Sequence, residues 1–256
     1  MKYSARTLEA RLFEAFHSPF ITGILGPRRV GKSTLIDHFV AQHPGLTIVR
    51  LNMDRMAERD RIKADQLESI ILTTLKRQLL PSRRVWITID EAQKCPEIFE
   101  QIKVLYDKYK DRDAIKFIVT GSALLELHRL SSESLAGRIQ LFQLSAFGLS
   151  ETTTLLHDIQ IEASIFDLIA KKENANVWQE YFNYLLPYSN ELKQTLAILQ
   201  IWGGLPEVLT LTSDNDRLDY LANYLQTYLE KDVRAIKSIT DLTLYRNLLE
   251  ISAEQT

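Results

Sequence analysis

The chain has 256 residues, of which 45% are hydrophobic and 25% are charged, and its formal net charge is −2. A chain of this length and composition can bury a sizeable core, so it does not need disulfides, and its single cysteine, Cys95, excludes an internal one. The near balance of charges argues against a dedicated nucleic-acid binder, which usually carries a strongly basic face, although it leaves a local basic patch open.

Neither end of the chain nor any internal run has the character of a membrane segment. The first residues, MKYSARTLEARLFEAF, have charges spaced through them and no apolar stretch of signal-peptide length. No later apolar run approaches the roughly 20 residues that are needed to cross a bilayer. Together with the single cysteine, this predicts a cytoplasmic protein without membrane association.

Five short apolar runs rich in β-forming residues precede residue 150, and they span residues 20–25, 46–52, 84–90, 115–121 and 138–147. The third and fourth are almost continuously apolar, which is typical of strands buried on both faces. Helical patterns lie between them, at residues 64–79 and 96–110 among others. Alternating strands and helices predict an α/β fold with a five-stranded parallel sheet and right-handed crossovers.

Beyond residue 150 the strand signals stop and the patterns become helical. The segment 217–233 has a helical pattern with one apolar face, formed by Leu218, Leu221, Ala222, Leu225, Leu229 and Val233. We therefore predict an α/β core over residues 1–150 and a smaller, all-helical lid domain over residues 151–256. The last apolar pattern, at residues 243–256, stops without a capping signal. We expect the fold to continue in a longer parent protein.

The stretch GPRRVGKST, residues 26–34, matches the pattern G-x-x-x-x-G-K-[ST] and stands between a predicted strand and a predicted helix. In that setting the N–H groups of the loop and of the helix start converge on an anion. Lys32 would place a charge between the β- and γ-phosphates, and Ser33 would offer a hydroxyl to Mg²⁺. The residues predicted to bind the nucleotide are Gly26, Pro27, Arg28, Arg29, Val30, Gly31, Lys32, Ser33 and Thr34. The alternative is a solvated basic turn before an ordinary helix.

An acidic pair follows the third predicted strand. Asp90 ends the apolar run, so it should emerge at the carboxyl end of the strand and hold Mg²⁺ through water. Glu91 comes next and is predicted to accept a proton from the attacking water. The alternative is a helix-capping or solvated acidic pair. On the next strand, Thr120 or Ser122 is placed to orient the γ-phosphate or the water, unless the strand simply ends in a turn.

Six blocks, taken together and in this order, resemble AAA+ family ATPases of bacteria and archaea, close to the archaeal ATPases and the STAND-type switch NTPases. The blocks are GPRRVGKSTL, ITIDEAQKCPEIFEQIKVLYD, FIVTGSALLEL, SLAGRIQLFQLSAFGLSE, GGLPEVL and YLQTYLEKDV. The first two are shared with many P-loop NTPases, whereas TGSALLEL, SLAGR and GGLPEV are more specific. The resemblance covers nearly the whole chain and implies an AAA+-type P-loop NTPase core with ATP as the nucleotide.

The resemblance also implies two further site residues. Arg138, in SLAGR, matches an arginine that could stabilise charge at the γ-phosphate, either in cis or in the site of a neighbouring subunit. Pro206, in GGLPEVL, matches the proline of a G-x-P motif that packs near the base. The alternatives are a surface arginine or ion pair, and an ordinary helix start. The family usually continues into a domain resembling restriction endonucleases, which this sequence lacks.

Several residue types are interpreted as structural. The five histidines are scattered, and no histidine neighbours Cys95 in sequence, so neither a zinc site nor a cysteine nucleophile is predicted. Aromatic residues of the C-terminal half are interpreted first as core and interface residues. They are Trp178, Tyr181, Tyr184, Tyr188, Trp202, Tyr220, Tyr224 and Tyr228.

Four functions compete at this point. The first is a Mg²⁺-dependent ATPase in which hydrolysis changes the angle between core and lid. The second is a switch that binds ATP or ADP tightly and turns over slowly. A small-molecule kinase and a nucleic-acid motor are less favoured, and nucleic acid stays undecided as a ligand. The sequence identifies no protein partner and leaves a homo-oligomer open.

Overall fold

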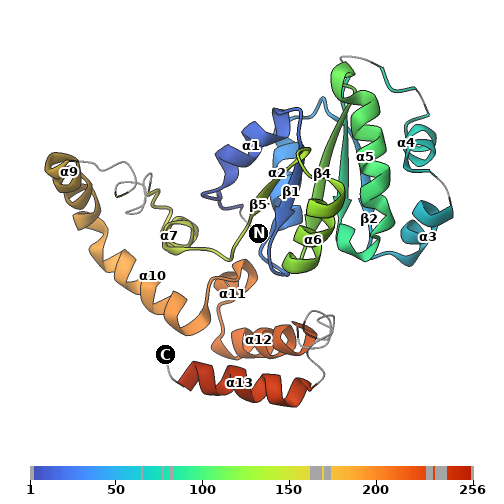
Figure 1. Ribbon diagram of the computed structural model, residues 1–256. Helices are drawn as coiled ribbons and strands as arrows, with labels where there is room; N and C mark the ends of the chain where they lie inside the picture. Colours follow the sequence, from blue (N-terminus) through green and yellow to red (C-terminus); the bar gives the residue numbers. More distant parts are fainter. Residues whose placement is uncertain are drawn as a thin grey trace.

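The computed structural model describes residues 3–64, 66–76, 78–80, 83–161, 169, 174–228, 233 and 241–254. A twisted sheet lies among the helices of the N-terminal half, and the helices that follow it in sequence extend away from it (Figure 1). Among the described residues, no helix has both the length and the apolar content to span a bilayer.

Five parallel strands form the sheet in the order β2-β3-β4-β1-β5. They are β1 (Ile21–Leu25), β2 (Thr47–Asn52), β3 (Val85–Asp90), β4 (Ile115–Gly121) and β5 (Ile139–Gln143). The prediction of a five-stranded parallel sheet is confirmed. The fifth strand ends at Gln143, four residues earlier than predicted. Because all strands are parallel, the loops that follow β1, β3 and β4 meet at one edge, which we call the carboxyl edge.

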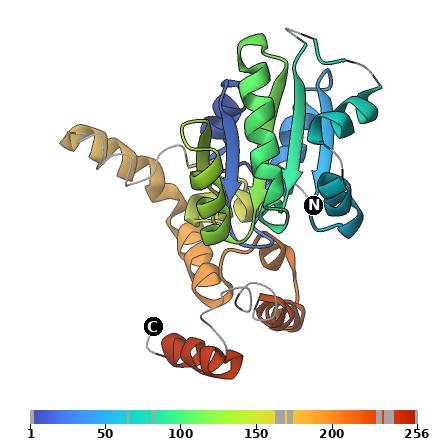
Figure 2. The same cartoon turned by 45° about the vertical axis from the view of Figure 1, so that its right-hand side comes forward.

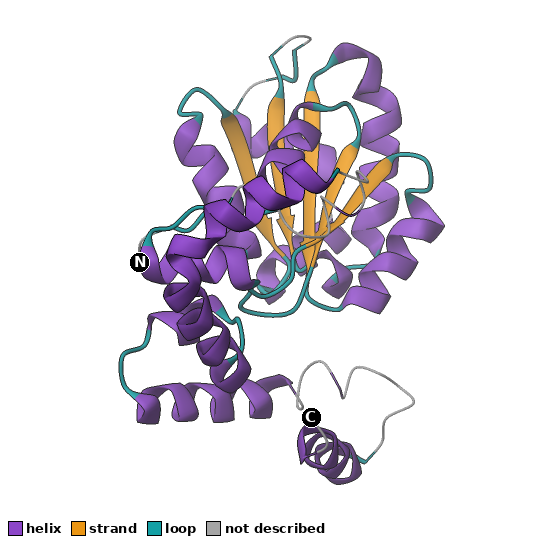
Figure 3. Cartoon of the chain, turned by 90° about the vertical axis from the view of Figure 1, so that its left-hand side faces the viewer, coloured by secondary structure: helices purple, strands orange, loops and turns teal. Residues whose placement is uncertain are grey.

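Helices cover both faces of the sheet (Figure 3). On one face, α1 (Glu9–His17) and α2 (Lys32–Gln42) pack through Phe16 and Phe39 against Trp86 of β3. On the other face, α3 (Met56–Ala64), α4 (Leu67–Leu75), α5 (Glu97–Tyr109) and α6 (Leu124–Ser134) surround a second cluster. This double covering explains the nearly continuous apolar runs of β3 and β4.

The region after β5 is helical, as predicted. It contains α7 (Leu149–His157), α9 (Ala175–Leu185), α10 (Ser189–Trp202), α11 (Pro206–Thr210), α12 (Asp214–Tyr228) and α13 (Leu242–Glu254). Helix α7 packs against α10. Helices α9 and α10 lead away from the sheet as an arm (Figure 2). The division into two domains at residue 150 stays a prediction.

The apolar helical face predicted over residues 217–233 is only partly covered in the structure. Leu218 is 57% exposed, and Ala222 is also exposed. None of the described residues of α12 is fully buried, whereas Val233 is. Leu229 lies outside the described residues. An amphipathic pattern alone does not determine whether another element covers the apolar side.

Candidate active site

The loop between β1 and α2 adopts a conformation that its glycines permit. Gly31 has φ 96°, in the left-handed region that favours glycine, and it stands directly before the first residue of α2. A Cβ on Gly26 would lie 2.1 Å from the carbonyl oxygen of Leu144. The backbone of the loop is therefore pressed against the end of β5, and the N-terminus of α2 opens toward the carboxyl edge.

Lys32 points back into this loop. Its side chain is buried, and its Nζ donates to the carbonyl oxygens of Gly26 at 2.7 Å and Pro27 at 2.8 Å. Both acceptors are neutral carbonyls, so phosphate oxygens would be stronger partners for the ammonium. The ammonium is therefore held inside the loop, and its contact with a phosphate stays a prediction.

The side chains of Asp90 and Ser33 face each other at the mouth of the loop. The Ser33 hydroxyl lies 3.4 Å from one carboxylate oxygen of Asp90, and the Thr120 hydroxyl donates to the other. A hydroxyl and a carboxylate are oxygen donors of the kind that Mg²⁺ prefers. The described residues contain no group of three or more His, Cys, Asp or Glu side chains that could hold a metal. A magnesium ion at this pair would complete its coordination with water and phosphate oxygens, so the donor set fits Mg²⁺ bound together with a nucleotide.

Glu91 follows β3 in a left-handed conformation, with φ 53°. One of its carboxylate oxygens accepts hydrogen bonds from the Ser122 hydroxyl at 2.7 Å and from the Gln93 amide at 2.6 Å. Ser122 thus contacts the glutamate, whereas the sequence predicted contact with the γ-phosphate or the water. Gln93 was not predicted, and only its position two residues after Glu91 could have suggested a role.

A cavity of about 590 Å³ opens in front of these side chains. Its core wall contains Arg28, Arg29, Gly31, Lys32, Ser33, Thr34, Asp54, Asp90 and Glu91. Its other wall comes from α11 and α12 and contains Pro206, Glu207, Tyr220, Asn223, Tyr224 and Thr227. The volume is in the range of small-molecule sites, and side chains from both halves of the chain line it.

Contacts across the cavity join the loop to the helices. The Tyr224 hydroxyl lies 3.4 Å from the Arg28 carbonyl oxygen, and the Arg29 guanidinium lies 3.5 Å from the Glu207 carboxylate. Burial, with the charge of Glu207, raises the pKa of Tyr220 to about 12, so its hydroxyl stays protonated and donates to Glu207. Tyr220 and Tyr224 were interpreted from sequence as core and interface residues, and in the structure they line the cavity between α12 and the loop.

Pro206 begins α11 and lines the cavity, and its packing near a nucleotide base stays a prediction. The preceding Gly204 lies against the chain that follows β5, where its carbonyl oxygen accepts a hydrogen bond from the Phe147 amide at 2.7 Å. A Cβ on Gly204 would be 2.1 Å from the Phe147 carbonyl oxygen. This close backbone approach fixes the start of α11 beside the core.

The structure does not bring Arg138 to the cavity. Arg138 directly precedes β5, at the amino edge of the sheet, and its carbonyl accepts from the amide of Ile21 at the start of β1. Its guanidinium pairs with both carboxylate oxygens of Asp107, each at 2.9 Å. The predicted contact with the γ-phosphate in cis does not fit this position, because the loop lies at the other end of β1. A role in the site of a neighbouring subunit stays a prediction.

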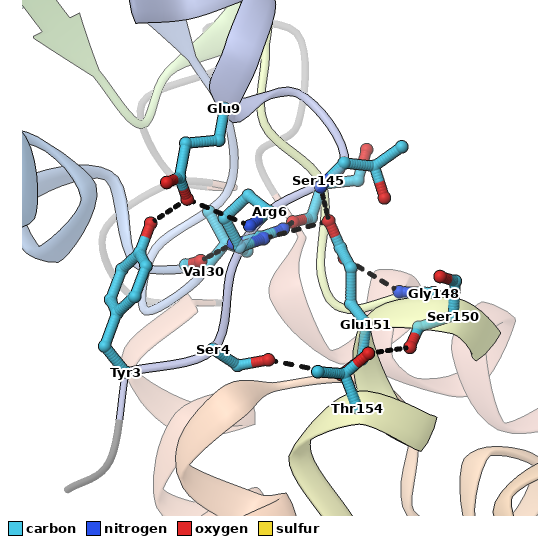
Figure 4. Close-up of polar contacts among 11 residues, drawn as sticks. Tyr3, Ser4, Arg6, Glu9, Val30, Ser145, Gly148, Ser150, Glu151 and Thr154 are labelled. Carbon is cyan, nitrogen blue, oxygen red and sulfur yellow. Dashed lines mark hydrogen bonds and ion pairs between the residues drawn. The ribbon is translucent and has the colours of Figure 1, made fainter. Parts of the chain in front are cut away.

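Arg6 is a site-associated residue that no sequence pattern indicated. It is buried, it pairs with Glu151 at 3.1 Å, and it donates to the carbonyl of Val30 in the loop at 2.7 Å (Figure 4). Residues 6, 30 and 151 are far apart in sequence, and no known motif joins them. Only the fold reveals this contact.

Comparison with protein families gives two matches. The model of the AAA domain matches residues 18–153. The model of a domain of unknown function (DUF8612) matches residues 193–256.

Comparison with curated proteins and solved structures gives more distant similarities. Uncharacterized proteins of Mycobacterium bovis and Mycobacterium tuberculosis are each 27% identical over 233 residues, covering 91% of this chain and 40% of theirs. The chain thus spans less than half the length of these relatives. The Walker-type ATPase paby2304 of Pyrococcus abyssi aligns with 17% identity and a TM-score of 0.48, covering 99% of this chain and 77% of its own. The ORC2 protein of Aeropyrum pernix aligns with 17% identity and a TM-score of 0.40, covering 62% of this chain and 53% of its own.

Proposed function

The chain belongs to the AAA domain family, and from this premise we propose that it binds ATP with Mg²⁺ and hydrolyses it to move the helical region relative to the core. The observation that carries the proposal is convergence at one cavity. The cavity is lined by Lys32, Ser33, Asp90 and Glu91. The first two residues lie at the start of α2, and the last two lie where β3 ends, just before η1 (Ala92–Lys94).

Binding would begin with the phosphates. The N-terminus of α2 and the loop amides offer donors to an anion, and Lys32 would exchange its two carbonyl partners for phosphate oxygens. Ser33 and Asp90 would hold Mg²⁺, which when bound neutralises charge on the triphosphate. The adenine and ribose would lie toward α11 and α12, where Pro206 and Tyr224 line the cavity.

Hydrolysis would use Glu91 as the general base. The water oxygen attacks the γ-phosphorus, its proton passes to the Glu91 carboxylate, and the bond between the γ-phosphorus and the bridging oxygen breaks to give ADP and phosphate. Ser122 and Gln93 hold one carboxylate oxygen and so fix the orientation of the base. We therefore assign Ser122 to positioning Glu91, with Gln93 as its partner.

The mechanical output would come from the two-sided cavity. Its walls belong to the core and to α11–α12, and its volume would differ between bound ATP, bound ADP and no nucleotide. A ligand that binds the closed arrangement more tightly shifts the chain toward it. The choice of adenine over guanine rests on the family rather than on a contact.

A second candidate, a slowly hydrolysing switch, is supported by a specific observation. Glu91 shares one carboxylate oxygen between two donors, and Lys32 is held by two carbonyls. In this candidate the two donors hold Glu91 away from the attacking water instead of toward it, so that hydrolysis is slow until a partner releases the carboxylate. The turnover rate separates the two candidates.

The test is an ATPase assay on the purified chain beside Glu91→Gln and Lys32→Ala, with Arg84→Lys as a control, because Arg84 pairs with Asp113 at the amino edge of the sheet. We expect the wild type to release phosphate in a Mg²⁺-dependent way. Glu91→Gln should bind ATP with turnover reduced about 100-fold or more, and Lys32→Ala should bind poorly. Equal phosphate release by wild type and Glu91→Gln would refute the assignment of the base. Tight ATP binding with no turnover would favour the switch.

A further inference from the structure

Arg6 lies outside every motif of the candidate site, yet it is one of the most completely buried charged residues described. Its side chain is 4% exposed and that of its partner Glu151 is 10% exposed. A buried guanidinium is tolerated only where acceptors satisfy its donors, and removing one partner leaves a costly unpaired charge. The fold therefore requires that the acceptors around the Arg6 guanidinium stay in place.

The guanidinium of Arg6 joins three segments (Figure 4). Nη1 donates to the carbonyl of Val30 at 2.7 Å, Nη2 to the carbonyl of Ser145 at 2.6 Å, and Nε to Glu151 at 3.1 Å. Its Cζ lies 4.5 Å from the ring centroid of Phe147. The guanidinium donors lie in one rigid plane, so displacement of one segment disturbs the contacts to the other two.

The loop end of this contact is next to the phosphate site. Val30 is the last residue before Gly31 and Lys32, and a Cβ on Gly31 would lie 3.7 Å from Nη1 of Arg6. Arg6 therefore contacts the loop through Val30 and is not itself among the residues that line the cavity. Its effect on a nucleotide would be indirect, through the position of the loop.

The other end of the contact is the start of α7. One oxygen of Glu151 accepts from the Thr7 amide at 2.8 Å, and the other accepts from the Gly148 amide at 3.1 Å, which caps the helix. Helix α7 packs against α10, and α10 leads into α11 at the cavity. The contacts of Arg6 thus connect the loop to α7. Helix α7 is the first helix after β5, and the later helices α11 and α12 line the cavity.

We propose that Arg6 is a positioning residue of the nucleotide site, which holds the loop through Val30 and couples its position to α7 through Glu151. The proposal rests on the proposed function for its effect on ATP binding. Its effect on the loop itself does not depend on that function. A lysine at this position keeps the charge opposite Glu151 but lacks the planar fork, so it cannot hold all three acceptors.

The test compares Arg6→Lys and Glu151→Gln with Arg84→Lys as a matched control. Arg84 also pairs with a carboxylate, that of Asp113, and donates to a carbonyl, that of His17, but it lies at the amino edge. Hydrogen exchange is measured without nucleotide in peptides covering residues 26–34, 85–90 and 148–157. The Kd for Mg-ATP is measured on the same samples.

We expect Arg6→Lys to speed amide exchange about tenfold at residues 26–34 and 148–157, with residues 85–90 unchanged, and to weaken Mg-ATP binding about tenfold. Arg84→Lys should leave the loop exchange and the Kd within about twofold of wild type. If Arg6→Lys does not fold, Glu151→Gln provides the same readout, because it keeps one oxygen to cap α7.

Loop exchange that stays at the wild-type rate in both variants would overturn the proposal. So would an increase that Arg84→Lys reproduces, or one spread equally over residues 85–90, because either would indicate general destabilisation. Failure of the wild type to bind Mg-ATP would refute the proposed function instead. The two failures are distinguishable, because exchange is measured without nucleotide.

Discussion

The sheet and the helices that follow it differ sharply in how much they bury. Every residue of β1 and all but the last of β3 are buried. In α9 and α12, by contrast, no described residue is fully buried, and large apolar side chains remain exposed. Across the helical region after β5, the exposed large apolar side chains include Phe182, Leu186, Ile201, Leu218, Leu244, Leu248 and Ile251. The core is stabilised by its own layers, whereas the helical region depends on a few contacts with the core.

This difference suits the proposed function. The phosphate-binding groups lie on the rigid side, at the carboxyl edge of a sheet covered on both faces. The other wall of the cavity lies on the side with few buried contacts, which is where conformational change requires the least free energy. The predictions below test the contrast, from the largest expected effect to the smallest.

The largest effect is expected from a cavity in the core. Phe99 on α5 is fully buried, so Phe99→Ala should lower the free energy of unfolding by about 3–5 kcal/mol. Leu248 on α13 is 57% exposed, so Leu248→Ala should change the free energy of unfolding by less than about 0.5 kcal/mol. Urea unfolding of both variants measures the contrast. Similar losses would mean that the helical region is packed as firmly as the core.

A smaller effect is expected where the two regions touch. A Cβ on Gly204 would meet the Phe147 carbonyl, so Gly204→Ala should cost about 1–3 kcal/mol and weaken nucleotide binding. The control is Gly45→Ala, because a Cβ on Gly45 meets nothing within 4 Å. Thermal unfolding with and without Mg-ATP measures both effects. If Gly204→Ala and Gly45→Ala change stability and Mg-ATP binding equally, the backbone contact between Gly204 and Phe147 does not hold α11 in place.

A pH-dependent effect is expected from a buried lysine in the core. Lys116 donates to the carbonyls of Ala15, Ser18 and Phe20, and burial, assisted by the charge of Arg84, lowers its pKa from 10.5 to about 7. Between pH 7 and 10 the unfolded chain therefore binds more protons than the folded chain, so stability should rise with pH. The contribution should be at most about 1.4 kcal/mol per pH unit.

The measurement is urea unfolding of wild type and Lys116→Met from pH 7 to 9. The difference between their free energies of unfolding should move in favour of the wild type as pH rises. A difference that is independent of pH would show that Lys116 remains charged in the folded chain over this range.

The smallest effect is expected from the ion pair across the cavity. Arg29 and Glu207 have side chains that are 64% and 45% exposed, so Glu207→Gln should change the free energy of unfolding by less than about 0.5 kcal/mol. Chemical denaturation at low salt is the measurement. A decrease in the free energy of unfolding above about 1.5 kcal/mol would mean that the ion pair, rather than the backbone contact between Gly204 and Phe147, joins the two regions.

The sequence predicted the sheet, the phosphate loop and the acidic strand because their signals are local. A run such as 84–90 is buried on both faces, and a G-x-x-x-x-G-K-[ST] loop requires only its flanking strand and helix. Ser33 and Asp90 meet because both stand at the carboxyl edge of a parallel sheet. These placements follow from chain order and strand direction alone.

What the sequence missed depends on contacts between distant segments. Arg6 and Glu151 are 145 residues apart, and nothing near either residue indicates the other. Arg138 was assigned through a motif, although its position at the start of the fifth predicted run already places it at the amino edge of a parallel sheet. Helix α12 was interpreted from its apolar face, whereas its polar side, with Tyr220 and Tyr224, lines the cavity.

The most direct test of the central claim is calorimetric titration of the wild-type chain with Mg-ATP, beside Lys32→Ala. The account predicts saturable binding at one site per chain, with affinity reduced at least about tenfold in Lys32→Ala because the ammonium that would meet the phosphates is gone. No saturable binding by the wild type, or equal affinity in Lys32→Ala, would contradict it.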